Sequence, residues 1–222
     1  MPRPDLASIG PALGPEPPRG CPLCPRLVAY RAENARAHPD WFNGPAPSWG
    51  DLGARLLVTG LAPGRTGANR TGRPFTGDHA GWLLYATLGK TGFAHGTYDP
   101  DGEDYLTLVD CMITNAVRCA PPGNKPETSE EANCRPFLAS RIAALPRLKV
   151  IVTLGDVARR NVLRALGLKA SDGPPGHGSE FRAGPYVVLN SYHCSRLNTN
   201  TGRLTPAMFE AVFRRARALL DG

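Results

Sequence analysis

The stretch GLAPGRTGANRTGRPFTGD at residues 60–78 combines five glycines and three arginines with one carboxylate, Asp78, at its end. Glycine-rich loops that follow strands often bind anions through backbone N–H groups, so a phosphate site is the first hypothesis. However, no Lys-Ser or Lys-Thr follows the last glycine, as nucleoside triphosphate loops require, and the spacing differs from the dinucleotide motif G-x-G-x-x-G. The loop by itself therefore leaves its ligand open.

Four of the six cysteines form a candidate metal-binding set. Cys21 and Cys24 are a C-x2-C pair, a spacing that suits adjacent ligands of one metal centre. Cys119 and Cys134 have 14 residues between them, which argues against a second close pair of a zinc ribbon. Four thiolates at irregular spacing suit a [4Fe–4S] cluster at least as well as zinc. Unpaired thiols in a reducing cytoplasm, or a redox role for the C-x2-C pair, are the alternatives that spacing leaves open.

The polar loop NSYHCSRLNTNTGRLT at residues 190–205 carries a third candidate group, His193. A lone histidine at a strand end is often structural, but an imidazole that faces Asp78 could donate a hydrogen bond to a developing anion. Leu197 stands alone among polar residues of this loop. An exposed leucine usually needs no explanation, but in a DNA-binding loop it could insert into the base stack.

The elements that would position these groups follow from hydrophobic patterning. Four short apolar runs are typical of buried parallel strands, and they lie at 56–59, 106–117, 149–154 and 186–190. Helical patterns alternate with them at 80–88, 128–145 and 156–166, and a last helix follows the N-cap Thr205. Strands that alternate with helices predict an α/β sandwich with a mostly parallel central sheet.

This arrangement predicts where the candidate groups meet. Ligands of such folds gather at the carboxyl ends of the strands. The polar loops at 60–78, 115–126 and 191–203 each follow a predicted strand. We therefore expect all three loops to converge on one edge of the sheet.

Length and composition set the outer limits. The 222 residues suit one large domain or two small ones. Residues 1–20 contain six prolines and lack the apolar core of a signal peptide, so we predict a flexible leader there and a single domain over residues 21–222. No apolar run is long enough to span a membrane, and we expect a monomeric, cytoplasmic protein without a membrane partner.

The charge balance points toward an acidic partner. The chain has 26 Lys and Arg residues against 19 Asp and Glu, a formal net charge of +7 and a pI of about 9.3. Most of the basic residues are arginines, whose guanidinium groups pair with phosphate oxygens, so a nucleic-acid partner is a reasonable hypothesis. Codon bias in a G+C-rich genome, which favours Arg, Pro, Gly and Ala together, would explain the composition equally well.

Taken together, these stretches resemble the uracil-DNA glycosylase superfamily, and specifically its family 5, the iron–sulfur type B uracil-DNA glycosylases. The matching segments are CPLCPRLV at 21–28, GLAPG at 60–64, NRTGRPFTGD at 69–78, AVRCAPPGNKP at 116–126 and SYHCSRLNTNTGRLT at 191–205. They occur in the order of the family, and the resemblance covers about residues 21–220.

The resemblance implies a three-layer α/β/α sandwich with a four-stranded, mostly parallel sheet. The activity it implies is hydrolysis of the N-glycosidic bond between deoxyribose and a damaged base in DNA, chiefly uracil but also other deaminated bases such as hypoxanthine. A [4Fe–4S] cluster would be the cofactor, with metal ligands Cys21, Cys24, Cys119 and Cys134. The product would be an abasic site, because the three loops contain no lysine for a lyase step except Lys125.

Individual roles follow from the same resemblance. Asp78 would stabilise the sugar cation and orient the attacking water, and His193 would stabilise the departing base anion. Phe75 matches the aromatic residue that stacks on the base, and Asn124 matches the pocket asparagine, whose amide offers a donor and an acceptor. The other candidate substrate-binding residues are Gly60, Ala62, Gly64, Asn115 and Leu197.

Asn115 departs from the pattern of the family, because many relatives have alanine at this position, and an amide there could favour one base. Five arginines are candidates for contacts with DNA phosphates, namely Arg65, Arg70, Arg73, Arg196 and Arg203. An alternative from another functional class is a non-catalytic iron–sulfur module that binds uracil-containing or single-stranded DNA. Asp78 argues against this alternative, because a carboxylate in a DNA-facing pocket repels phosphates.

Overall fold

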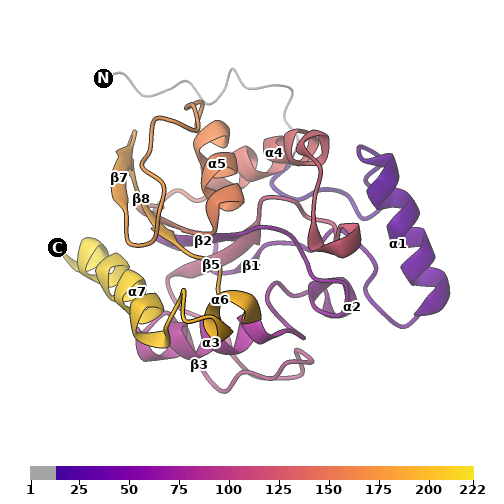
Figure 1. The fold of residues 1–222 in the computed structure, drawn as a ribbon, viewed down its shortest axis with the longest axis horizontal. Coiled ribbons are helices and arrows are strands. Elements are labelled where there is room, and N and C mark those ends of the chain that lie inside the picture. Colours follow the sequence, from indigo (N-terminus) through magenta and orange to yellow (C-terminus); the bar gives the residue numbers. More distant parts are fainter. Residues whose placement is uncertain (1–13) are drawn as a thin grey trace.

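In the computed structural model, which describes residues 14–222, one central sheet lies between two layers of helices (Figure 1). The sheet has six strands in the order β1-β5-β2-β6-β8-β7. Its four middle strands are parallel, and β1 and β7 pair antiparallel at the two edges. The strands are β1 (Trp49–Gly50), β2 (Leu56–Gly60), β5 (Cys111–Asn115), β6 (Val150–Leu154), β7 (Glu180–Ala183) and β8 (Tyr186–Ser191). Strands β3 (Ala94–His95) and β4 (Thr107–Leu108) form a separate hairpin-like pair.

The predicted α/β/α sandwich is confirmed, whereas the predicted count of four strands is wrong by two. The four parallel middle strands lie within the four apolar runs. The two additional strands lie at the edges, where one face or both faces meet solvent, so neither carries a continuous apolar run. Their sequences therefore lack the signal by which the middle strands were found.

Adjacent residues of the strands point into two separate cores, because successive side chains of a strand alternate between the faces of the sheet. Leu56 and Val58 of β2 pack with helices α3 (His79–Lys90) and α7 (Pro206–Asp221). Leu57, between them, packs with α4 (Thr128–Ala143) and α5 (Asp156–Ala165). The remaining helices are α1 (Pro25–Ala37), α2 (Ala68–Thr71), the 3-10 turn η2 (Pro122–Asn124) and α6 (Arg196–Asn200).

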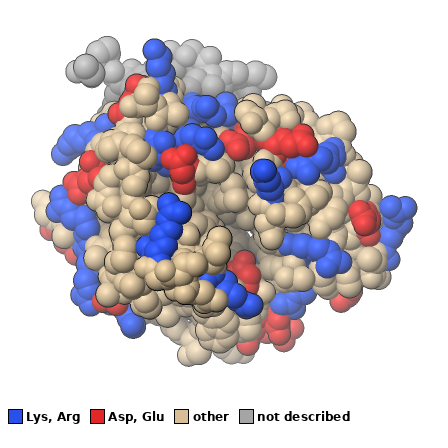
Figure 2. Space-filling model, in the orientation of Figure 1, with Lys and Arg blue, Asp and Glu red and all other residues tan. Residues whose placement is uncertain are grey.

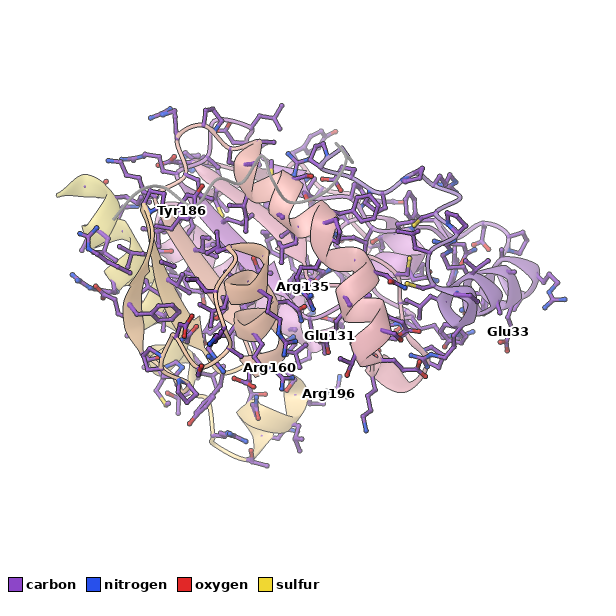
Figure 3. The ribbon with its side chains drawn as sticks, turned by 90° about the horizontal axis from the view of Figure 1, so that it is seen from above. Glu33, Glu131, Arg135, Arg160, Tyr186 and Arg196 are labelled. Carbon is purple, nitrogen blue, oxygen red and sulfur yellow. The ribbon has the colours of Figure 1, made fainter. Side chains whose placement is uncertain are left out.

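Polar contacts also hold the second layer together. Figure 3 shows Glu131 and Arg135 on the side of α4 that faces α5. Between these two side chains lies the buried Asn161 of α5, which donates from Nδ2 to a Glu131 oxygen at 2.7 Å and accepts from Arg135 at 3.4 Å. None of the helices in the described part of the chain is both long and apolar enough to cross a membrane.

The sequence predicts a flexible leader over residues 1–20, of which residues 1–13 lie outside the described part. Within residues 14–20, the side chains of Glu16 and Arg19 form hydrogen bonds with the domain. The Glu16 carboxylate accepts hydrogen bonds from Arg118 (2.8 Å), Arg141 (2.5 Å) and the backbone N–H of Ser48 (3.0 Å). The Arg118 side chain is only 1% exposed. Glu16 therefore supplies the negative charge that a buried guanidinium requires.

Replacing Glu16 with glutamine is expected to lower the free energy of unfolding by about 3 kcal/mol, because it leaves the buried Arg118 without its counter-charge. Urea unfolding measures this loss. The matched control is Glu33→Gln, since Glu33 is exposed on α1 and points away from the domain (Figure 3). It should change stability by less than about 0.5 kcal/mol. Equal midpoints for the two variants would contradict a stabilising role for Glu16.

Candidate active site

The three polar loops converge on one cleft at the carboxyl ends of β2, β5 and β8, which confirms the expectation from the sequence. The lining residues are Leu61, Ala62, Gly64, Arg65, Thr66, Gly77, Asp78, His79, Ala80, Asn124, His193, Ser195 and Arg196. A smaller inner pocket opens from the cleft and is lined by Ala62, Pro63, Gly64, Phe75, Asp78, Asn115 and His193. Figure 2 shows the surface hollowed near its centre, with Lys and Arg side chains around the hollow.

Asp78 lies where the glycine loop meets helix α3. Its Oδ1 accepts a hydrogen bond from the backbone N–H of Gly81 at 3.1 Å and so caps the helix. Its Oδ2 faces the loop, because a methyl group placed on Gly64 or Gly67 would lie 3.5 Å from it. The residue is open to solvent in the cleft, yet the surrounding protein raises the pKa of the carboxyl above its usual value by desolvation, against the lowering effect of two backbone N–H groups. Oδ1 thus caps the helix, whereas Oδ2 faces the glycine loop at the cleft.

His193 follows β8 and lines both the cleft and the inner pocket. Desolvation lowers the pKa of its imidazole to about 4, so the ring is neutral at pH 7. The backbone oxygen of His193 accepts a hydrogen bond from the Asn198 side chain at 2.8 Å, which ties the residue to α6. A neutral imidazole can donate one N–H to an anion without carrying a charge of its own.

Phe75 forms one wall of the inner pocket and lies opposite His193, with the two ring centroids 6.2 Å apart and their planes 26° from parallel. Its backbone has φ 58°, an uncommon conformation for a residue other than glycine. The conformation is fixed by its surroundings, since the Phe75 oxygen accepts from the Tyr98 hydroxyl and the oxygen of Pro74 accepts from Tyr85. These two tyrosines were not among the residues singled out in the sequence, and no local motif marks them.

Asn115 ends β5 at the inner pocket, directly beside Gly60 of β2 in the parallel register. Its side chain is buried, and its Oδ1 has no hydrogen-bond partner among residues 14–222. A Cβ on Gly60 would come within 2.4 Å of that oxygen and 2.6 Å of the Phe75 ring. Gly60 is therefore required for close packing, and Asn115 presents an unused acceptor at the pocket.

Asn124 and Leu197 lie on the rim. Asn124 is exposed at the end of η2 and lines the cleft from the side of β5, with φ 56°. Leu197 projects from α6 and is 72% exposed. Ala62 lines the cleft on one side and packs against the cysteine cluster on the other.

The five arginines proposed for phosphate contacts differ in their surroundings. Arg65 and Arg196 line the cleft. The Arg65 guanidinium forms hydrogen bonds with Asn34 of α1 and with His38, the residue that follows α1. Arg203 is exposed above the Tyr192 ring at 4.5 Å and lines a second pocket that shares His193 with the cleft. Arg70 pairs with Asp101 at 2.5 Å on the surface.

Arg73 requires a correction. Its guanidinium pairs with Asp104 through two hydrogen bonds, at 2.7 and 3.1 Å, and lies 4.2 Å from the centre of the Trp49 ring. The side chain is only 11% exposed. Its charge is therefore neutralised inside the protein, where it supports the Phe75 wall through Tyr85 and Tyr98, and it is not available to DNA.

The four cysteines singled out in the sequence surround one cavity beside α1. Cys24 is the N-cap of α1, and Pro25 takes the first helical position, which explains the sequence CPLCP. Cys21, Cys119 and Cys134 are buried in the same apolar cluster, and no cysteine of the chain forms a disulfide. No group of three or more Cys, His, Asp or Glu side chains in the described part of the chain is arranged around a single metal ion.

Three N–H groups point at the sulfurs of this cavity. Arg31 donates to Cys119 Sγ at 3.1 Å, the backbone N–H of Arg118 donates to Cys134 Sγ at 3.2 Å, and Asn133 lies 3.7 Å from Cys24 Sγ. Desolvation raises the pKa of the Cys119 thiol to about 11. Donors of this kind suit sulfurs that carry negative charge as ligands of a metal centre.

Comparison with known proteins agrees with this geometry. The family model of the Uracil DNA glycosylase superfamily matches residues 47–217, which include all three cleft loops. The chain belongs to this superfamily. A Type-5 uracil-DNA glycosylase from Thermus thermophilus is 44% identical over 206 residues, which cover 90% of this chain and 93% of the relative.

Two further members show where the chain lies within the superfamily. A Type-5 uracil-DNA glycosylase from Pyrobaculum aerophilum is 42% identical and covers 89% of this chain and 88% of its own length. A Type-4 uracil-DNA glycosylase from the same organism is 31% identical and covers 68% of this chain and 64% of its own length. The chain is thus more similar to these Type-5 members of the superfamily than to the Type-4 member.

Proposed function

We propose that the protein is a uracil-DNA glycosylase of the Type-5 kind, which hydrolyses the N-glycosidic bond of uracil in DNA and leaves an abasic site. The observation that carries this proposal is the inner pocket, where Asp78 and His193 face one space that Phe75 and Asn115 close. Hypoxanthine and other deaminated bases are proposed as further substrates. The intact site within one chain supports action as a monomer, and the substrate supports a location with the DNA of the cell.

Extrusion of the base has to precede the chemistry, because the glycosidic carbon is not accessible inside a duplex. The inner pocket would receive the base, while the wider cleft would receive its sugar and the neighbouring phosphates. Arg65 and Arg196 line the cleft, and Arg203 lies beside it, so their charges favour the phosphate backbone. The glycine loop lets the strand approach the backbone closely, because Gly64 has no side chain to occupy the cleft.

Two charges develop as the bond breaks, a cation on the sugar and an anion on the base. The Oδ2 of Asp78 faces the glycine loop at the cleft, where it favours the cation electrostatically and can also hold the attacking water. His193, neutral because of its low pKa, donates to the base anion. No lysine lines the cleft in the described part of the chain, which supports hydrolysis rather than a lyase step.

A [4Fe–4S] cluster is proposed for the cysteine cavity, with Cys21, Cys24, Cys119 and Cys134 as its ligands. Four cysteines around one cavity fit the four thiolate ligands that such a cluster takes. The N–H groups aimed at three of the sulfurs suit the negative charge of such a centre. The cluster would be structural, since it would tie the start of α1 to α4 and to the loop that carries Asn124.

Anaerobically purified protein is expected to contain about four irons per chain and to show a broad absorbance shoulder in the visible range. Cys134→Ala should lose most of this iron. The matched control is Cys111→Ala, because Cys111 is also fully buried but lies in the core around β5, away from the cavity. Iron analysis and the absorbance spectrum test this, and stoichiometric zinc in a colourless parent protein would reject the cluster.

Asn115→Ala is expected to slow the excision of both uracil and hypoxanthine by about tenfold, the size of one lost hydrogen bond. The reason is the free Oδ1 in the inner pocket, which can accept from a ring N–H, a group that both bases carry. Single-turnover excision of the two bases from otherwise identical duplexes measures both rates. Unchanged rates for both bases would remove Asn115 from base binding.

The proposed function itself is tested by incubation with a uracil-containing oligonucleotide, followed by alkali. Strand cleavage at the uracil position after alkali, but not before it, is the expected result for a monofunctional glycosylase. Cleavage without alkali would indicate a lyase step. Binding of the oligonucleotide without any cleavage would favour the alternative, a non-catalytic iron–sulfur module that binds DNA.

A further inference from the structure

Helix α6, which carries Arg196 and Leu197 at the rim of the cleft, has no buried residue. It is also only five residues long, and helices of this length are not stable in water on their own. Apolar packing therefore does not fix its position over the cleft. Whatever holds α6 in place has to be polar.

Two side-chain hydrogen bonds tie α6 to other elements. Asn198 donates from Nδ2 to the backbone oxygen of His193 at 2.8 Å. The hydroxyl of Thr199 lies 2.9 Å from Nε2 of His79, the first residue of α3. The two ties reach the two sides of the cleft, since one ends on His193 and the other on the neighbour of Asp78.

The direction of the hydrogen bond between Thr199 and His79 follows from the single proton of the Thr199 hydroxyl. Thr199 Oγ1 has one proton, and the backbone oxygens of Arg196 and Ser195 lie within 3.1 and 3.3 Å as acceptors for it. The hydroxyl oxygen is then left to accept, so His79 donates its Nε2–H. An imidazole that donates from Nε2 performs this task in its neutral form as well as in its charged form.

We propose that His79 and Thr199 are positioning residues, which hold α6 so that Leu197 can enter the base stack when a paired uracil is extruded. The inference rests on the proposed function. The hydrogen bond contributes to extrusion and not to breakage of the glycosidic bond. The effect of this hydrogen bond on the excision rate should therefore depend on whether the uracil is stacked and paired in the substrate.

This dependence gives a test that a merely structural role would not pass. Thr199→Val keeps the shape of the side chain and removes the hydroxyl. It should slow single-turnover excision from a U·A duplex by about tenfold, the size of one neutral hydrogen bond, and leave excision from single-stranded DNA within about twofold. The matched control is Thr201→Val, because within residues 14–222 the Thr201 hydroxyl bonds only to backbone oxygens of its own short helix.

Three further measurements complete the experiment. His79→Leu should slow duplex excision like Thr199→Val, and the double variant should be no slower than either single one, since all three lack the same bond. His79→Gln should retain most of the duplex rate, because its amide can donate in place of Nε2–H. A 2-aminopurine beside the uracil should fluoresce less in the complex with Thr199→Val, because fewer bases are unstacked.

The outcomes separate this inference from the proposed function. A parent protein that excises uracil from neither substrate would reject the proposed function. If the parent excises uracil and Thr199→Val slows excision from both substrates equally, or from neither, the role of the His79–Thr199 bond would be overturned while the proposed function stands. A double variant that is tenfold slower than each single variant would also overturn it, because the two residues would then act independently.

Discussion

Asp78→Asn is expected to slow excision of uracil by ~10²–10⁴-fold while the protein folds normally and binds uracil-containing DNA at least as tightly as the parent. The substitution removes the charge that favours the sugar cation, but it keeps the shape of the side chain. The Asn oxygen can still accept from the Gly81 N–H, so the cap of α3 is retained. Affinity should stay equal or improve, because one repulsion toward phosphate is gone.

Stability gives an independent expectation for the same variant. Desolvation raises the pKa of Asp78 in the folded protein, so the ionised carboxylate costs stability at neutral pH, and this cost disappears as the pH falls through the raised pKa. Asparagine has no charge to desolvate. The melting temperature at pH 7 should therefore be unchanged or higher, as expected when a catalytic group is kept at some cost to stability.

The competing account makes Asp78 only a helix cap, and on that account Asp78→Asn would remain fully active. The matched control is Asp51→Asn, because Asp51 also accepts a backbone N–H, that of Gly53 at 2.7 Å, and lies in the turn before β2, at the opposite end of that strand from the cleft. Single-turnover excision, DNA affinity and melting temperature are measured for both variants. A folded, DNA-binding and fully active Asp78→Asn protein would rule out Asp78 as the catalytic carboxylate.

The elements that could be predicted from the sequence are those with a local signal. The middle strands carry continuous apolar runs, and α7 begins where Thr205 caps it and Pro206 opens it. The convergence of the loops follows from the parallel order of these strands. By contrast, the run at 106–117 is divided into β4 and β5, because Asp110 adopts a φ of 54° while its carboxylate pairs with Arg55.

Contacts between distant segments could not be predicted in the same way. Glu16 and Arg118 are 102 residues apart, and only the fold reveals that a proline-rich leader supplies the counter-charge of a buried arginine. Arg73 looks like its neighbours in a basic, glycine-rich loop, but Asp104 neutralises it from 31 residues away. The type of a residue shows which groups it can bind, whereas the partner that it binds depends on which distant segments the fold brings beside it.

His193→Ala is expected to slow uracil excision by ~10²–10³-fold, the usual cost of one preorganised donor to a developing anion. The imidazole lies in the inner pocket opposite Phe75, and its neighbour Asn198 fixes its backbone. The control is His95→Ala, because His95 is exposed on β3 and lines neither the cleft nor the inner pocket. His95→Ala should excise uracil at close to the parent rate.

The pH profile decides in which form His193 acts. Because its pKa is lowered to about 4, the ring is neutral in the folded protein throughout the range from pH 6 to 8, whereas a free histidine would change charge near pH 6.5. The titration of His193 should therefore cause no inflection near pH 6.5 in the single-turnover rate of the parent. The stability of the parent should fall as the pH drops from about 6.5 toward 4, since the unfolded chain then binds a proton that His193 in the folded protein does not, and His193→Ala should lessen this fall. A rate that declines tenfold per pH unit above 6.5 in the parent, and not in His193→Ala, would mean that the charged imidazolium stabilises the leaving base and that the neutral donor is wrong.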